Sequence, residues 1–153
     1  MQSFFSIIIP TFNRPTMALN AIKSIARQTF NDFEVIIIND GSAQDYEIVK
    51  KEILSRNIFK YFLKQSKGPS AARNYGIDNS SGKFICFLDD DDEYMENHLQ
   101  VLYDNIKANN FGIGLYKTLT YIKTGSRIKK QDYVRNSASK KSLELLYNNI
   151  VIP

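Results

Sequence analysis

Four consecutive aspartates at positions 89–92 directly follow the apolar run at 84–88. Like charges about 4 Å apart repel each other by roughly 1 kcal/mol in water, so such a run needs cations or full solvation. Side chains of an extended segment alternate between two sides, which would place Asp89 and Asp91 together. Two carboxylates suit Mg²⁺ or Mn²⁺, which take their remaining ligands from water and substrate phosphates. The run therefore predicts a metal site completed by a phosphorylated substrate; the alternative is a solvated acidic loop.

Two other side chains suit the same kind of ligand. Arg73 lies in "GPSAARNYG", near the expected start of a helix after Pro69, where backbone N–H groups and a guanidinium both favour anions. Asp40 ends an apolar run and can accept a hydrogen bond from a ribose hydroxyl or a base N–H. For Arg73 the alternative is a surface arginine paired with an aspartate. For Asp40 it is a turn former or helix cap. Lys67 is a weaker candidate for contact with an anion.

Short apolar runs alternate with amphipathic stretches over about the first hundred residues. This pattern predicts strands at 4–9, 33–40, 84–88 and, as a flanking strand, 58–63, with helices from about 15, at 44–55, at 70–78 and around 99–106. Such alternation is typical of a parallel sheet covered by helices on both faces, with ligands at the carboxyl ends of the strands. The segments "PTFNR", "NDGS", "SKGPSAARN" and "DDDD" should therefore share one edge of the sheet.

Several single residues carry further expectations. The helix at 44–55 should bury Ile48, Val49 and Ile53. Cys86 has apolar neighbours and is predicted to be a small core residue rather than a reactive thiol. His98 is predicted to be a surface residue and not a ligand.

Composition limits the class of protein. The chain has 153 residues, 43% hydrophobic and 24% charged, which is typical of one soluble globular domain. No apolar run reaches the length of a membrane helix, the first residues do not resemble a signal peptide, and one cysteine excludes an internal disulfide. A cytoplasmic location is expected. The basic segment 117–141 could contact an anionic lipid surface at the inner face of the membrane, or simply be solvated. It accompanies no recognised nucleic-acid-binding module.

The segment after the first strand excludes two common phosphate sites. A dinucleotide-binding turn needs glycines there, and "PTFNRP" has none. A phosphate-binding P-loop is also missing from the sequence. Cations must therefore hold any phosphate at this edge.

Four segments together resemble the donor half of a family 2 glycosyltransferase with the GT-A fold. They are "SIIIPTFNR" (6–14), "QTFNDFEVIIINDGS" (28–42), "KGPSAARNYGI" (67–77) and "GKFICFLDDDDEY" (82–94). The resemblance implies an α/β fold with a mostly parallel sheet and helices on both faces. It also implies a nucleotide-sugar donor, with a UDP-sugar foremost, a Mn²⁺ or Mg²⁺ ion, and transfer with inversion to a glycan or lipid-linked acceptor in cell-surface polysaccharide synthesis.

The resemblance also implies roles for single residues. Four would line the nucleotide pocket: Pro10, Thr11, Phe12 and Arg14. Asp40 would contact the base, Arg73 the base or the diphosphate, and Asp90 the ribose. Asp91 matches the metal-binding last acid of the DxD motif, and Asp89 its first acid. The family usually has a small residue where Asp90 stands, so the working pair of acids is less certain than the motif itself.

The last third of the sequence is expected to be incomplete. Residues 1–111 are predicted to form the donor-binding subdomain and 112–153 the start of an acceptor-side portion, with strands in 112–123, a helix at 139–150 and a new element at "VIP". The general base of such enzymes is expected beyond Pro153, so no catalytic residue is assigned and the chain alone is expected to be inactive. The alternatives are a sugar-nucleotidyltransferase, which "PTFNRP" disfavours, and a non-catalytic nucleotide-binding or interaction domain.

Overall fold

The structure, a computed structural model, describes residues 2–54 and 56–111 in full and the backbone of four short strands after them. In chain order the elements are β1 (Phe5–Thr11), α1 (Pro15–Ala26), β2 (Phe33–Asn39), α2 (Glu47–Ile53), β3 (Phe59–Leu63), α3 (Pro69–Asp78), β4 (Phe84–Phe87), α4 (His98–Ala108), β5 (Tyr116–Lys117), β6 (Tyr121–Thr124), β7 (Arg127–Lys130) and β8 (Ile150–Ile152). The order of the main sheet is β3-β2-β1-β4-β8-β5. The strands β1 to β4 are parallel, which confirms the predicted mostly parallel α/β sheet and places β3 at its edge.

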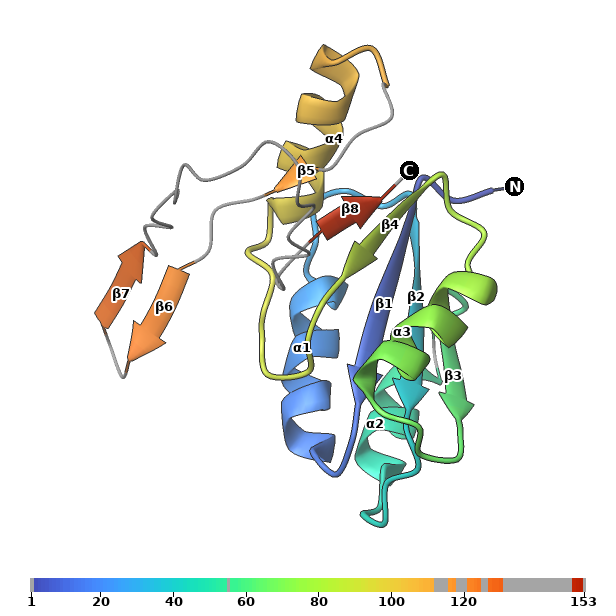
Figure 1. Ribbon diagram of the computed structural model, residues 1–153. Coiled ribbons are helices and arrows are strands. Elements are labelled where there is room, and N and C mark those ends of the chain that lie inside the picture. The colour runs from blue at the N-terminus through green and yellow to red at the C-terminus, as the bar shows by residue number, and fades with distance from the viewer. Residues whose placement is uncertain are drawn as a thin grey trace, which may run out of the picture.

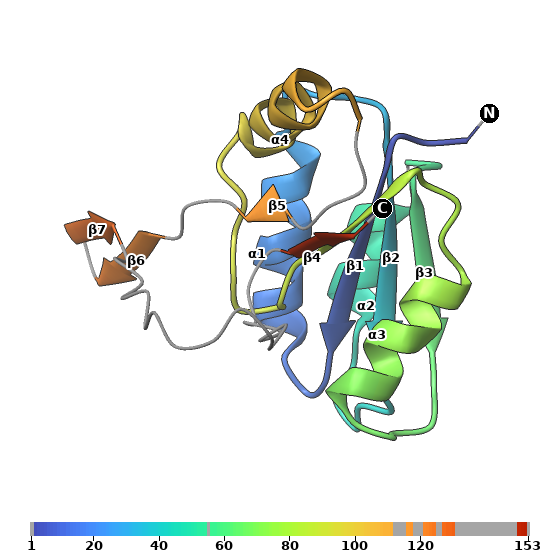
Figure 2. The same cartoon turned by 45° about the horizontal axis from the view of Figure 1, so that its top comes forward.

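Helices cover both faces of this sheet (Figures 1 and 2). Successive residues of β1 point to opposite faces: Ile7 and Ile9 pack with α1, α2 and α4, whereas Ile8 packs with α3. Because both faces are covered, every residue of β1 and β2 is buried. This explains why their sequences are nearly continuous apolar runs.

Helix α3 lies unusually close to β1. A Cβ atom added at Gly76 would stand 2.4 Å from Cγ2 of Ile8, so only glycine allows this approach. Pro69 occupies the first turn of α3, where its missing N–H costs no hydrogen bond. The close contact fixes α3 against the sheet and thereby sets the position of Arg73.

The prediction for α2 was partly wrong. The helix begins at Glu47, later than expected, because Asn13 Oδ1 accepts hydrogen bonds from the N–H groups of Ala43 and Gln44 and holds them in a loop. Val49 is buried as predicted, but Ile48 is 46% exposed. Ile48 lies one residue, about 100° of helical rotation, away from the buried face.

The last strands extend the sheet beyond β4. Strand β8 pairs antiparallel with β4 on one side and β5 on the other, while β6 and β7 form a separate antiparallel pair. The strands expected in 112–123 and the element expected at "VIP" are confirmed by β5, β6 and β8. The helix expected at 139–150 lies outside the described residues except for Ile150, which belongs to β8. The domain division at residue 111 stays a prediction.

A buried carboxylate links the four parallel strands. Glu34 of β2 accepts hydrogen bonds from Ser6 Oγ of β1 at 2.6 Å and from Ser81, before β4, at N (2.6 Å) and Oγ (2.9 Å). Lys60 of β3 forms an ion pair with it at 2.7 Å. Burial alone would raise the pKa of Glu34, but these donors outweigh burial and lower the pKa from 4.5 to about 2.

Candidate functional site

The loops that follow β1 to β4 meet at the carboxyl edge of the sheet, toward which the arrowheads of these strands point (Figure 1). The first two loops are tied together by Asn13, whose backbone lies in the left-handed region at φ 55°. Its side chain accepts hydrogen bonds from the loop after β2, and its N–H donates to Ser42 Oγ at 2.8 Å. The segment "PTFNR" is therefore fixed on the edge of the sheet.

The acidic run forms a tight turn rather than an extended segment. The N–H of Asp92 donates to the carbonyl oxygen of Asp89 at 3.0 Å, which closes a turn with Asp90 and Asp91 at its centre. The expected alternation is therefore wrong, because the turn rotates neighbouring side chains together. Asp90 is 2% exposed, whereas the side chain of Asp91 is 53% exposed.

Two arginines form ion pairs with three of the four aspartates in this run. The guanidinium of Arg14 forms ion pairs with Asp90 Oδ1 at 3.2 Å and with Asp91 Oδ2 at 3.0 Å. Arg73, from the second turn of α3, pairs with Asp89. Cations from the loop after β1 and from helix α3 thus reduce the repulsion between the like charges of this run. The alternative expected for Arg73, pairing with an aspartate, is also present.

Hydrogen bonds as well as ion pairs hold Asp90 in place. Thr11 Oγ1 donates to Asp90 Oδ2 at 2.8 Å and also lies 2.7 Å from the hydroxyl of Tyr46. Tyr46 also accepts a hydrogen bond from the N–H of Arg14 at 3.1 Å. Burial raises the pKa of Asp90, and the hydrogen bond from Thr11 and the charge of Arg14 act against that rise. Sequence reasoning missed Tyr46, since no local pattern marks a residue whose contacts are this distant.

Asp40 holds the loop before α3. Its carboxylate accepts hydrogen bonds from the N–H of Gly68 at 2.9 Å, the N–H of Lys67 at 3.1 Å and the hydroxyl of Ser66 at 3.3 Å. It is 6% exposed. These contacts are with a distant loop and are neither the local turn nor the helix cap expected as the alternative. Contact with a base stays a prediction.

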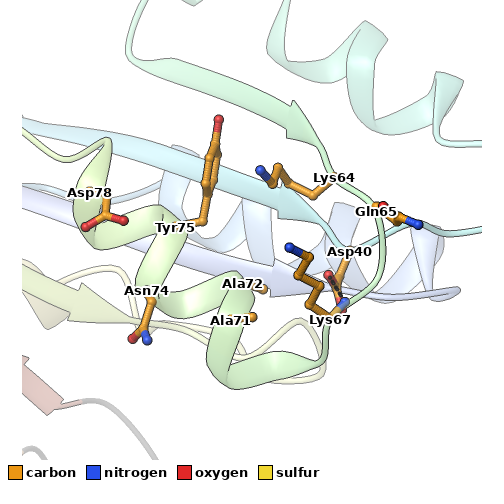
Figure 3. Close-up of a pocket in the computed structure, with 9 residues that line it drawn as sticks. All are labelled: Asp40, Lys64, Gln65, Lys67, Ala71, Ala72, Asn74, Tyr75 and Asp78. Atoms are coloured by element: carbon orange, nitrogen blue, oxygen red, sulfur yellow. Dashed lines mark hydrogen bonds between the residues drawn. The ribbon is translucent and has the colours of Figure 1, made fainter.

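The remaining candidates occupy different parts of the edge. Pro10 is buried as part of β1, whereas Phe12 is 46% exposed and presents its ring to solvent. Lys67 lines a pocket of about 280 Å³ between α3 and the loop after β3, in which Lys64 Nζ stands 3.9 Å from the Tyr75 ring centre (Figure 3). The other lining residues are Asp40, Gln65, Ala71, Ala72, Asn74 and Asp78. The pocket is small for a ligand site and excludes Arg14 and the acidic turn, so we take the edge itself as the candidate site.

The donor set of the acidic turn suits a divalent cation. One oxygen of Asp90 and one of Asp91 already meet on a single positive group, the guanidinium of Arg14. Carboxylate oxygens are the ligands that Mg²⁺ and Mn²⁺ prefer. Within residues 2–54 and 56–111, no three or more Asp, Glu, His or Cys side chains are arranged to hold an ion by themselves. An ion at this turn needs further ligands from a substrate or water.

Two other sequence expectations have clear outcomes. Cys86 is fully buried, and burial raises the pKa of its thiol, which confirms a core residue. The surface position expected for His98 is wrong: its ring stacks on Tyr94 with centroids 3.8 Å apart, and its Nε2 atom is buried. Burial lowers the pKa of His98 from 6.5 to about 4.

Comparison with known families agrees with this geometry. The model of the family described as "Glycosyl transferase family 2" matches residues 6–152. The chain belongs to glycosyl transferase family 2. Membership confirms the resemblance drawn from the four segments and separates the chain from the sugar-nucleotidyltransferases.

Relatives of this family 2 chain match about two thirds of its residues. A Campylobacter jejuni GalNAc(5)-diNAcBac-PP-undecaprenol beta-1,3-glucosyltransferase is 43% identical over 107 residues, which cover 68% of this chain and 34% of that protein. An uncharacterized glycosyltransferase of Rickettsia bellii is 43% identical over 106 residues, which cover 69% and 15%. The chain thus spans only 15% to 34% of the length of these relatives.

Solved structures share the fold of the family 2 chain. S. aureus TarS 1–349 in complex with UDP-GlcNAc superimposes with a TM-score of 0.65 and 26% identity, over 72% of this chain and 32% of that one. The likeness confirms the GT-A fold of the parallel sheet. Among the residues that the structure describes, no helix is long and apolar enough to cross a membrane.

Proposed function

We propose that this chain is the nucleotide-sugar-binding part of an inverting glycosyltransferase that transfers a sugar from a nucleoside diphosphate to an acceptor hydroxyl. The single observation that carries the proposal is that arginines from the loop after β1 and from helix α3 form ion pairs with Asp89, Asp90 and Asp91 at this edge. The complex of TarS with UDP-GlcNAc supports a UDP-sugar as donor.

The donor would bind along the edge of the sheet through residues of different loops. Pro10 and Thr11 end β1, and Phe12 follows them on the first loop, where its exposed ring offers a surface on which a base can stack. Arg73 lies beside the acidic turn, where its guanidinium can donate to a diphosphate oxygen. Asp90, fixed by Thr11, presents an acceptor for a ribose hydroxyl.

A Mn²⁺ or Mg²⁺ ion would be held by Asp91 with Asp89 as the second acid, next to Asp90. Such an ion neutralises charge that develops on the leaving diphosphate. Asp89 and Asp91 belong to one tight turn, which is closed by the hydrogen bond from the N–H of Asp92 to the carbonyl oxygen of Asp89. The buried Asp90 is the alternative partner for Asp91, because both already contact one cation.

The acceptor side is proposed from the relatives. The printed name of the C. jejuni relative specifies an undecaprenol-linked acceptor, and B. subtilis GgaB, 41% identical over 92 residues, is named a minor teichoic acid biosynthesis protein. We infer a glycan or lipid-linked acceptor in cell-surface polysaccharide synthesis, met in the cytoplasm at the inner face of the membrane. No described residue is assigned as the general base, so the chain alone should bind donor without transferring sugar.

Calorimetry can test this proposal. A sample shown by circular dichroism to be folded is titrated with UDP and with GDP, in Mn²⁺ and in EDTA. We expect UDP to bind more tightly in Mn²⁺ than in EDTA, because the ion bridges the diphosphate to Asp91. Equal affinity in both buffers would remove the metal from the proposal. Acceptor-dependent release of nucleotide from a UDP-sugar by this chain would show that it contains its own general base.

A further inference from the structure

We propose that the guanidinium of Arg14 is a resident counter-cation of the acidic turn, which a divalent ion must displace. The inference rests on the proposed metal site at this turn. Arg14 contacts Asp90 at 3.2 Å and Asp91 at 3.0 Å, so one positive group already holds two carboxylates together. A metal ion and the guanidinium would compete for the carboxylate oxygens of Asp90 and Asp91, because the two cations repel each other when both bind the same oxygen.

The backbone around Arg14 confines this exchange to its side chain. Asn13 is held by Ser42, and the N–H of Arg14 donates to the hydroxyl of Tyr46. Pro15 follows at the first position of α1 and fixes the chain direction. The side chain of Arg14 is 48% exposed, so it can leave the acids without disturbing the core.

The acids, in contrast, keep their places when the guanidinium leaves. Asp90 is 2% exposed and accepts a hydrogen bond from Thr11 at 2.8 Å, and the turn is closed by the bond between Asp92 and Asp89. The carboxylate of Asp90, and the backbone that carries Asp91, are thus held in place for a cation. A free guanidinium beside them would be placed to meet the diphosphate that arrives with the ion.

This arrangement couples metal binding to nucleotide binding. Without nucleotide, Arg14 opposes the metal. With nucleotide, the diphosphate gives Arg14 a new anionic partner and gives the ion new ligands. The metal should therefore bind weakly to the chain alone and more tightly in the presence of UDP, and Arg14 should account for part of that difference.

The test is a titration with Mn²⁺, followed by loss of the free-ion electron paramagnetic resonance signal, for the wild type and three variants. Arg14→Gln removes the competing charge, and Arg14→Lys keeps a charge without the two-pronged contact. Arg27→Gln is the matched control, since Arg27 pairs with Glu93 beside the turn at 3.7 Å and is similarly exposed. Circular dichroism and thermal unfolding establish that each variant is folded.

Because Arg14 and Asp91 are each about half exposed, solvent weakens their attraction, and we expect Arg14→Gln to tighten Mn²⁺ binding by about threefold to tenfold. UDP should then strengthen Mn²⁺ binding less than it does in the wild type. Arg14→Lys should lie between the two, and Arg27→Gln should match the wild type.

If Arg14→Gln binds Mn²⁺ with wild-type affinity, or if Arg14→Gln and Arg14→Lys bind it equally more tightly, the ion does not displace Arg14. Either result would leave the proposed metal site itself uncontradicted. Equal tightening in Arg27→Gln would also overturn it, because general loss of positive charge would then be the cause. No Mn²⁺ binding by any of the four proteins, with or without UDP, would remove the metal site itself and the displacement with it.

Discussion

Replacement of Glu34 by glutamine should destabilise the whole parallel sheet. The carboxylate is buried and accepts from Ser6, Ser81 and Lys60, which lie on or beside the other three parallel strands. A pKa lowered from 4.5 to about 2 corresponds to about 3 kcal/mol of stability at neutral pH. Lys60 is 44% exposed, so solvent screens part of its attraction, and we expect a loss of about 2 kcal/mol.

The pH dependence distinguishes this mechanism from a general packing defect. Because the folded-state pKa of Glu34 lies below its unfolded value, its contribution is present above pH 4.5 and is lost as the pH falls towards 2. Urea unfolding followed by circular dichroism should therefore show a large difference between wild type and Glu34→Gln at pH 7. The difference should shrink steadily below pH 4.5.

The control is Glu47→Gln, which removes an exposed ion pair with Lys50 at one turn of α2. It should leave the unfolding midpoint nearly unchanged, since exposed pairs contribute little. At neutral pH, Glu34→Gln should lower the thermal midpoint by about 4–8 °C for a domain of this size. A difference that stays constant from pH 7 to pH 2.5, or no difference at all, would refute the reasoning.

Three further predictions concern the helices and the acidic turn. As the pH falls from 6.5 to 5, the free energy of unfolding should fall, because His98 takes up a proton in the unfolded chain but not in the folded one, where its pKa is about 4. In urea titrations, His98→Phe should keep the stacking on Tyr94 and lose this dependence of stability on pH. An unchanged pH dependence would contradict the role given to His98. Gly76→Ala should cost about 1–3 kcal/mol in thermal unfolding, because its Cβ would meet Ile8 at 2.4 Å; an equally stable variant would show that α3 can shift away. In calorimetry with UDP and Mn²⁺, Asp91→Asn should weaken binding at least tenfold and more than Asp92→Asn does, and the reverse order would place the ion on different oxygens.

The strands and their common edge could be predicted because the signals are local. Each parallel strand is an apolar run bounded by polar or turn residues, and the rule that ligands bind at the carboxyl ends then gathers the loops. The same rule predicts that Asp40, Arg73 and the acidic run lie at one edge of the sheet. Their assigned roles in donor binding stay predictions.

The errors come from contacts that no local pattern records. The turn at Asp89 depends on arginines far away in the chain; Arg14 and Asp91 are 77 positions apart. The apolar pattern of 44–55 predicts a buried Ile48, but α2 begins only at Glu47 and buries Val49 instead. The loop that delays the helix is held by Asn13, which belongs to another segment. His98 is covered through its stacking on Tyr94, a consequence of how the segment before α4 folds back.

The pairing of β8 with β4 bears on the order in which a newly made chain can fold. The parallel strands β1 to β4 and the helices between them are complete once residue 87 has left the ribosome. The outer edge of β4, at Ile85 and Cys86, receives its partner only when Ile150–Ile152 has been synthesised. Until then that edge is an unpaired row of N–H and C=O groups, which can pair with another chain. The interval between these two points of synthesis is therefore when the nascent protein is most exposed to misassembly, and when a chaperone would protect it most.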